Sequence, residues 1–131
     1  MNKKILLVDD DEDQLELTRR ILDRKGFEVL TASSGLTALD IFSRRKSDIF
    51  VAVLDVLMPG ADGRMLATKM KTIAPETPVI FFSHYGFTGK ATKWGVKGID
   101  HVMKNDEEQL VSLIEKYHKG NTVKPGRPSK R

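Results

Sequence analysis

Short apolar runs alternate with amphipathic stretches along most of this chain, which predicts alternating strands and helices. Runs of this kind, bounded by charged or turn-forming residues, are typical of strands buried on both faces of a parallel sheet. The third run, 49–54, is apolar at every position. The five predicted strands cover residues 4–8, 27–31, 49–54, 78–83 and 99–103.

Apolar residues at helical spacing predict a helix after each strand. Glycine at position 26 is expected to end the first helix and Gly120 the last, while Asn105 is a candidate cap at the start of the last helix. The stretch 87–95 is rich in Gly, Thr and Lys and predicts only a short, weak helix. The predicted helices cover residues 13–25, 34–46, 64–74, 87–95 and 105–118.

Five alternating strand–helix units with short connections predict an α/β fold. The expected architecture is a flavodoxin-like, doubly wound, five-stranded parallel sheet in the order 2-1-3-4-5, flanked by five helices. The first and third strands are neighbours in this order. Ligands bind in such sheets at the carboxyl ends of the strands, where the strand order reverses.

Carboxylates follow both strands that border this point. Asp9 and Asp10 come directly after the first strand, and Asp55 comes directly after the third. Acids are tolerated at surface strand ends, but three that converge repel one another and favour a site for a cation. Oxygen ligands select magnesium, manganese or calcium. The acids 11–13 are instead expected in the following loop and the first turn of a helix, where negative charge suits the helix dipole.

Two further polar residues end strands at the same predicted edge. Ser83 ends the fourth strand and Lys104 follows the fifth. A cation, an ammonium and a hydroxyl around carboxylates suit the stabilisation of a phosphoryl group during its transfer. Either residue alone is more commonly a turn residue or a surface charge.

Composition and charge divide the chain in two. The 131 residues fit one domain without cysteine, membrane span or signal peptide, so we expect a cytoplasmic protein with no membrane contact. Six of the 22 basic residues and none of the 18 acidic ones lie in 116–131, which leaves 16 basic and 18 acidic residues before them. We expect a folded domain over 1–119 and a basic, disordered tail or linker over 120–131.

Residues 3–119 resemble the receiver domain of bacterial two-component response regulators. The resemblance rests on the acidic pair after "ILLV", on "DVLMPGADG" (55–63), on Ser83 and on Lys104. It implies that Asp55 accepts a phosphoryl group from a sensor histidine kinase or a histidine phosphotransfer protein. The domain would not be an enzyme in the ordinary sense, because it would catalyse only its own phosphotransfer and a slow autodephosphorylation.

The resemblance also implies a role for each site residue. Asp10 and Asp55 would bind Mg²⁺ directly, Asp9 through water, and the Leu57 backbone carbonyl would complete the protein's ligands. Lys104 would pair with Asp55 and later with the phosphoryl group. Ser83 would hydrogen-bond that group and switch the face formed by the fourth helix, fifth strand and fifth helix, which would contact an output protein or a second copy of the chain.

Three positions depart from the family's pattern. His84 stands where a small residue is usual, His101 where an aromatic switch residue is usual, and Asn105 where a proline is usual. His84 would either crowd the phosphoryl pocket or face solvent. His101 would replace the aromatic rotamer switch and add pH sensitivity.

An alternative function is that of a DNA-binding transcriptional response regulator. The tail contains Gly126-Arg127-Pro128, the core of short segments that enter the minor groove of DNA. A solvated linker is the competing interpretation, since basic runs are commonly solvated or make only nonspecific phosphate contacts. Two other classes are disfavoured: a flavin or nucleotide binder would need a glycine-rich phosphate loop, and a haloacid-dehalogenase-type phosphatase an Asp-x-Asp pair on its first strand.

Overall fold

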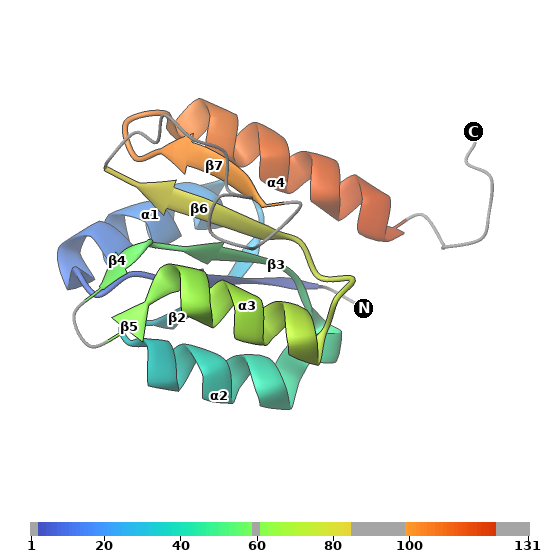
Figure 1. Cartoon of the computed structure of the whole chain (residues 1–131). Coiled ribbons are helices and arrows are strands. Elements are labelled where there is room, and N and C mark those ends of the chain that lie inside the picture. Colours follow the sequence, from blue (N-terminus) through green and yellow to red (C-terminus); the bar gives the residue numbers. More distant parts are fainter. Residues whose placement is uncertain (1–2, 59–60, 85–98, 123–131) are drawn as a thin grey trace.

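The computed structural model describes residues 3–58, 61–84 and 99–122, and its centre is a five-stranded parallel sheet (Figure 1). The strands lie in the order β2-β1-β3-β6-β7, and each neighbouring pair is parallel. This is the predicted 2-1-3-4-5 order, which places β1 beside β3. The five strands are β1 (Lys4–Val8), β2 (Glu28–Ala32), β3 (Ile49–Leu54), β6 (Val79–Ser83) and β7 (Asp100–Met103).

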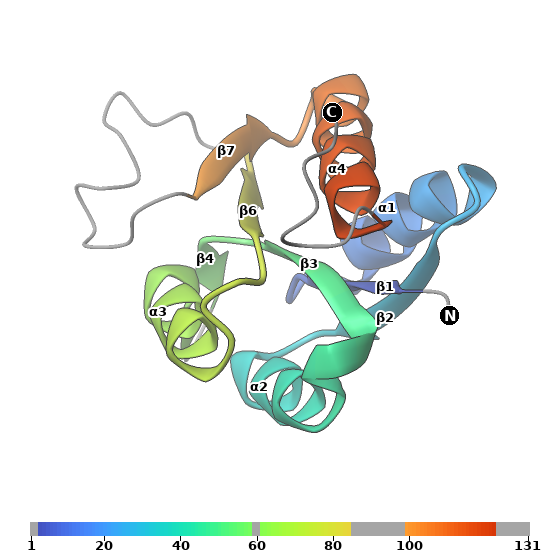
Figure 2. The same cartoon turned by 90° about the vertical axis from the view of Figure 1, so that its right-hand side faces the viewer.

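Helices cover both faces of the sheet (Figure 2). α1 (Glu12–Arg24) and α4 (Glu107–Thr122) lie on one face, and α2 (Gly35–Arg45) and α3 (Gly63–Ile73) on the other. A short 3₁₀ turn, η1 (Lys46–Asp48), leads into β3. The predicted helix 87–95 lies outside the described residues.

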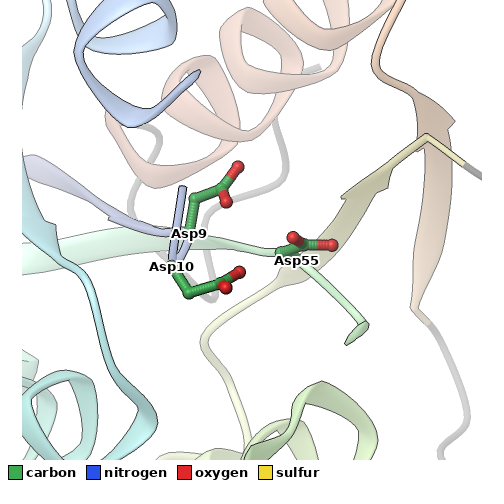
Figure 3. Close-up of side chains that lie close together, drawn as sticks. All are labelled: Asp9, Asp10 and Asp55. Atoms are coloured by element: carbon green, nitrogen blue, oxygen red, sulfur yellow. The ribbon is translucent and has the colours of Figure 1, made fainter. Parts of the chain in front are cut away.

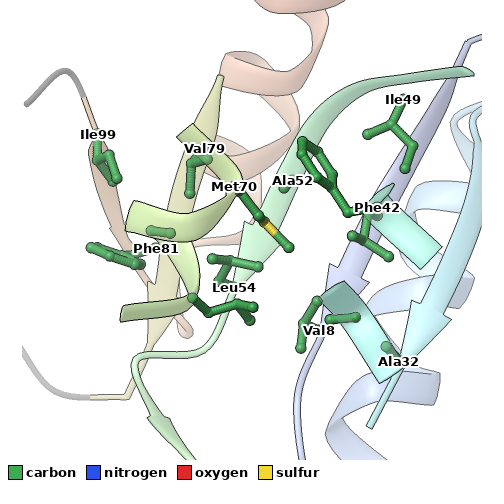
Figure 4. Packing of buried hydrophobic residues seen from close by; sticks show 14 of the residues in the cluster. Val8, Ala32, Phe42, Ile49, Ala52, Leu54, Met70, Val79, Phe81 and Ile99 are labelled. Atoms are coloured by element: carbon green, nitrogen blue, oxygen red, sulfur yellow. The ribbon is translucent and has the colours of Figure 1, made fainter. Parts of the chain in front are cut away.

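The alternation of side chains along β1 explains why the core has two halves. Leu6 and Val8 belong to the cluster under α2 and α3, whereas Ile5 and Leu7 belong to the cluster under α1 and α4. Figure 4 shows the first cluster, in which Phe42 and Met70 reach the sheet from the helices. Each large apolar side chain buried in this way stabilises the fold by about 2 kcal/mol. Every residue of β3 is buried, which fits its continuous apolar pattern.

The ends of α1 follow the predicted signals. Asp11 is the N-cap, and its side chain accepts hydrogen bonds from the backbone N–H groups of Asp13 and Gln14. Gly26 has a φ of 93° and stands directly after the helix. The N–H groups of Gly26 and Phe27 donate to the carbonyls of Asp23 and Leu22, the arrangement that closes a helix with a left-handed glycine.

The predicted ends of the last helix are wrong. Asp106 caps α4, not Asn105, because its side chain accepts a hydrogen bond from the Gln109 N–H at 3.1 Å. Gly120 does not end α4, which continues to Thr122. A glycine ends a helix when it takes a left-handed conformation; Gly120 does not take one and costs the helix only about 1 kcal/mol relative to alanine.

A short antiparallel ladder was not predicted. β4 (Leu57–Met58) and β5 (Ala61–Asp62) pair between β3 and α3, so the chain forms a small hairpin directly after Asp55. Two-residue strands are too short to give an alternating pattern, and for this reason the sequence indicated only a turn here.

Candidate functional site at the carboxyl edge of the sheet

The three predicted carboxylates converge where β1 and β3 end (Figure 3). Asp9, Asp10 and Asp55 each offer a carboxylate oxygen, and these oxygens all lie within 4.8 Å of one another. Asp9 is only 4% exposed, Asp55 is half-buried and Asp10 is exposed. The cluster therefore has a buried side and a side open to solvent.

Backbone hydrogen bonds hold two of these residues beyond the ends of their strands. The Asp55 N–H donates to the Val8 carbonyl at 3.0 Å, and the Asp9 N–H donates to the Ala32 carbonyl at 3.1 Å. These bonds extend the pairing of β3 with β1 and of β1 with β2. The positions of Asp9 and Asp55 therefore follow from the register of the sheet.

Lys104 follows β7, on the far side of β6, and its side chain contacts the residues that follow β1 and β3. Its Nζ lies 2.5 Å from Asp9 Oδ2 and 3.3 Å from Asp55 Oδ2, and the side chain is buried. The Lys104 N–H donates to the Ser83 carbonyl at 2.8 Å, which places these two residues at adjacent strand ends. Ser83 is fully buried. The structure thus pairs the Lys104 side chain with Asp9 and Asp55, and it joins Lys104 to Ser83 through a backbone hydrogen bond.

The charges of this site are unbalanced. Three carboxylates face one ammonium, so the cluster has a formal net charge of −2 when all four groups are ionised. At 4 Å, two like charges repel by about 4 kcal/mol at an effective dielectric constant of 20. A divalent cation would neutralise this charge. The donors are all oxygens and one carboxylate is open to solvent, which suits Mg²⁺ because this ion keeps several of its waters.

Gly63 lies directly against the backbone that carries Asp55. A Cβ atom at position 63 would stand 2.3 Å from the Asp55 carbonyl oxygen and 2.8 Å from the Val56 Cα. The Gly63 N–H also donates to the Val56 carbonyl at 2.8 Å. In the sequence this glycine stands out only as part of the motif 55–63, and the available signal for its role is that it follows an aspartate and begins a helix.

Asp62 fixes the start of α3 next to that glycine. Its side chain accepts a hydrogen bond from the Arg64 N–H and pairs with the Arg64 guanidinium at 2.8 Å. This guanidinium holds the pKa of the Asp62 carboxyl below its usual range. The hairpin and the first turn of α3 are thereby joined by one side chain.

The two histidines lie in different surroundings. His84 is exposed directly after β6, and His101 is half-buried on β7 opposite Phe81. Their roles stay predictions, as does that of the Leu57 carbonyl in β4.

A contact between Tyr117 and Asp100 was missed from the sequence. The Tyr117 hydroxyl of α4 donates a hydrogen bond to the Asp100 carboxylate at the start of β7. Burial, together with this bond, raises the pKa of Tyr117 to about 12. The two residues are 17 positions apart and share no local pattern, so only the folded chain brings them together.

The family model for the response regulator receiver domain matches residues 5–115. The chain therefore belongs to the receiver domain family. It is a phosphoacceptor signalling domain of the two-component class, as the resemblance implied.

The similar proteins include single domains and larger regulators. The chain is 36% identical to sporulation initiation phosphotransferase F of Bacillus subtilis over 86 residues, which are 66% of this chain and 68% of that protein. It is 35% identical to the transcriptional regulatory protein GlrR of Escherichia coli over 113 residues, 85% of this chain but only 25% of the relative. Because the chain spans only a quarter of this relative, the similarity does not extend the relative's activity to this chain.

Solved structures agree with the fold. A response regulator receiver domain protein from Clostridium thermocellum superposes with a TM-score of 0.82 at 30% identity, covering 92% of this chain and 97% of that one. The receiver domain of the hybrid histidine kinase CckA gives a TM-score of 0.74 at 29% identity, covering 88% and 98%. Among the described residues, no helix is long and apolar enough to cross a membrane.

Proposed function

We propose that Asp55 is the residue that accepts the phosphoryl group. The observation that carries this proposal is the position of its side chain, which is 12% exposed. Its carboxylate lies within 4.8 Å of the Asp9 and Asp10 carboxylates and 3.3 Å from the Lys104 ammonium. Asp9 is more deeply buried and Asp10 is exposed. Asp55 thus combines access to a donor with a nearby positive charge.

The transfer is a substitution at phosphorus. A carboxylate oxygen of Asp55 forms the new P–O bond as the P–N bond of a phosphohistidine breaks, and the electron pair of that bond returns to the imidazole nitrogen. Lys104 neutralises negative charge on the phosphoryl oxygens, and the Ser83 hydroxyl donates a hydrogen bond to one of them. Positioning and charge supply the catalysis, because the protein forms no other covalent bond.

We propose that Asp10 and Asp55 bind Mg²⁺ directly, with Asp9 acting through water and the Leu57 carbonyl as a further ligand. The contacts of Asp9 support its indirect role. Its Oδ1 accepts the Asp11 N–H at 2.9 Å, and its Oδ2 accepts from Lys104 at 2.5 Å. The bound ion supplies positive charge to the phosphoryl oxygens.

The acyl phosphate is proposed to be long-lived. Leu57, which follows the nucleophile by two positions, has no carboxamide or carboxyl group to orient an attacking water. The domain then acts as a switch rather than as a phosphatase.

We propose a histidine kinase or a histidine phosphotransfer protein as the donor. The Bacillus relative is by its name a phosphotransferase, and the chain covers two thirds of it. This similarity supports a role in a phosphorelay. The proposed output face, for a partner protein or a second copy of the chain, comprises β7, α4 and the predicted helix 87–95, which lies outside the described residues.

The test is phosphorylation by a small-molecule phosphodonor with Mg²⁺, followed by intact-mass measurement. The wild type is expected to gain the mass of one phosphoryl group, and Asp55→Asn is expected to gain none. Asp40→Asn serves as the matched control, because Asp40 is an exposed carboxylate on α2 that pairs with Arg44. Equal labelling of Asp55→Asn and the wild type would remove the basis of the proposal.

A further inference from the structure

The residues on either side of Gly63 are joined by several hydrogen bonds that cross this glycine. Asp62 is the last residue of β5 and the N-cap of α3, and its Oδ1 accepts the Arg64 N–H at 2.8 Å. The Arg64 guanidinium donates to both carboxylate oxygens, from Nε to Oδ1 at 3.1 Å and from Nη2 to Oδ2 at 2.8 Å. We call the two guanidinium–carboxylate bonds the Asp62–Arg64 fork. Because the fork engages both oxygens, it holds the Asp62 side chain in one orientation.

The fork is better suited to fixing a geometry than to stabilising the fold. Two parallel bonds between a guanidinium and a carboxylate restrict the relative orientation of both groups. The side chains of Arg64 and Asp62 are 40% and 35% exposed, and ion pairs open to solvent in this way contribute little to overall stability. We therefore look for the effect of the fork in the position of the residue between its two ends.

That residue, Gly63, packs directly against the peptide group of Asp55. A Cβ atom at position 63 would stand only 2.3 Å from the Asp55 carbonyl oxygen, so the two backbones leave no space between them. The Gly63 N–H also donates to the Val56 carbonyl at 2.8 Å. Close-packed groups transmit a displacement instead of absorbing it. A shift of Gly63 would therefore move the backbone of Asp55 and Val56.

The sheet fixes only one side of Asp55. Its N–H donates to the Val8 carbonyl at 3.0 Å, which continues the pairing of β3 with β1. β3 itself ends at Leu54, and the chain then leaves the sheet for the hairpin of β4 and β5 (Figure 1). The contact with Gly63 lies on the carbonyl side of Asp55, beyond the end of the strand. The sheet and the start of α3 thus hold the Asp55 backbone from opposite sides.

We propose that Asp62 and Arg64 are positioning residues for Asp55. Their fork holds Gly63 against the Asp55 peptide group and so sets where the Asp55 carboxylate lies. The inference rests on the function proposed above, in which Asp55 binds Mg²⁺ and accepts the phosphoryl group. Mg²⁺ demands near-ideal octahedral geometry, and a nucleophile must be aligned with the atom it attacks. A small displacement of Asp55 therefore weakens metal binding and slows phosphorylation together.

A role in helix capping alone predicts a different result for the variant Asp62→Asn/Arg64→Gln. Asparagine is as good an N-cap as aspartate, and the backbone N–H of residue 64 is present with either side chain. The double variant therefore keeps the cap and removes only the fork. It also removes one charge of each sign, so the net charge near the site stays the same and the direct electrostatic effects on a bound cation largely cancel.

The test compares this double variant with the wild type in two measurements. The first is a Mg²⁺ titration followed by thermal unfolding, which gives the Kd for the metal; the second is the rate of labelling by a small-molecule phosphodonor at saturating Mg²⁺. The variant is expected to bind Mg²⁺ more weakly and to be labelled more slowly, each by roughly two- to fivefold, because an exposed ion pair holds a geometry only modestly. Its Tm without metal is expected to stay close to that of the wild type.

The matched control is Asp40→Asn/Arg44→Gln, which removes an exposed aspartate–arginine pair from α2 and is expected to behave like the wild type in both measurements. An unchanged Mg²⁺ affinity or labelling rate in Asp62→Asn/Arg64→Gln would overturn the positioning role, as would equal losses in the two double variants. Labelling of the wild type at Asp55 would in that case leave the proposed function intact. A wild type that is neither labelled nor stabilised by Mg²⁺ would overturn both proposals.

Discussion

Lys104 lies closer to Asp9 than to Asp55, at 2.5 Å against 3.3 Å. The buried lysine therefore neutralises the buried carboxylate first, and the half-buried Asp55 shares the same ammonium. The pair between Lys104 and Asp55 that the resemblance implied is present, and the closer pair with Asp9 was not predicted. A phosphoryl group on Asp55, as proposed above, would compete with Asp9 for this ammonium and so act on the Lys104–Asp9 ion pair.

Replacing Lys104 by glutamine is expected to lower the free energy of unfolding by about 3 kcal/mol, because the variant leaves a buried carboxylate without its cation. Urea unfolding without metal measures this loss. Lys69→Gln, at an exposed position of α3, is the control and is expected to change stability by less than about 0.5 kcal/mol. Similar losses in both variants would contradict the assigned role of the Lys104 ion pairs.

Replacing Asp10 by asparagine is expected to stabilise the metal-free protein, since the variant removes one of three mutually repelling carboxylates. The expected gain is about 1 kcal/mol, because Asp10 is exposed and its repulsion is partly screened. Thermal unfolding without Mg²⁺ tests the repulsion, and thermal unfolding with Mg²⁺ tests whether Asp10 is a ligand. The wild type should gain stability on addition of Mg²⁺ and the variant should not; a Tm shift of the same size in both would exclude Asp10 as a ligand.

Gly63 and Gly120 are expected to respond oppositely to alanine. A Cβ at position 63 meets the Asp55 carbonyl oxygen at 2.3 Å, so Gly63→Ala must displace the backbone of the site and should both destabilise the fold and slow phosphorylation. A Cβ at position 120 meets nothing within 4 Å, and the residue is helical. Gly120→Ala should therefore stabilise the protein by about 0.5–1 kcal/mol. Chemical unfolding and phosphodonor labelling of both variants provide the comparison, and a neutral Gly63→Ala would show that the site tolerates this displacement.

Tyr117 is expected to make stability depend on alkaline pH. Its folded pKa of about 12 lies above the ordinary value of 10.0, so between these values the folded state keeps a proton that the unfolded state loses. The free energy of unfolding should thus be unaffected below pH 10 and fall as the pH rises from 10 to 12. Tyr117→Phe lacks this titration. The stability difference between wild type and variant should shrink over that window, and a constant difference would refute the assigned cause.

The sequence predicted those parts of the fold that depend on local patterns. The alternation of apolar runs with amphipathic stretches was sufficient for the strand order, and the acids after β1 and β3 were then sufficient for the convergence of Asp9, Asp10 and Asp55. Lys104 and Ser83 were predicted at the correct edge because the carboxyl ends of parallel strands lie at the same edge of the sheet.

The remaining features depend on contacts between distant residues. The preference of Lys104 for Asp9 depends on how the ends of β7 and β1 approach each other, and the bond between Tyr117 and Asp100 depends on how α4 packs on β7. No local pattern encodes either contact. The predicted end of α4 at Gly120 is wrong, because a glycine ends a helix where its backbone becomes left-handed and Gly120 does not take that conformation.

The central claim is that Asp55, and no other carboxylate of the cluster, carries the phosphoryl group. The most direct measurement is reduction of the phosphorylated protein with borohydride, which converts an aspartyl phosphate to homoserine, followed by peptide mass spectrometry. We predict homoserine at position 55 in the wild type, dependent on the phosphodonor, and none at positions 9 and 10. Homoserine at position 9 or 10, or its absence from position 55 in labelled protein, would contradict the account.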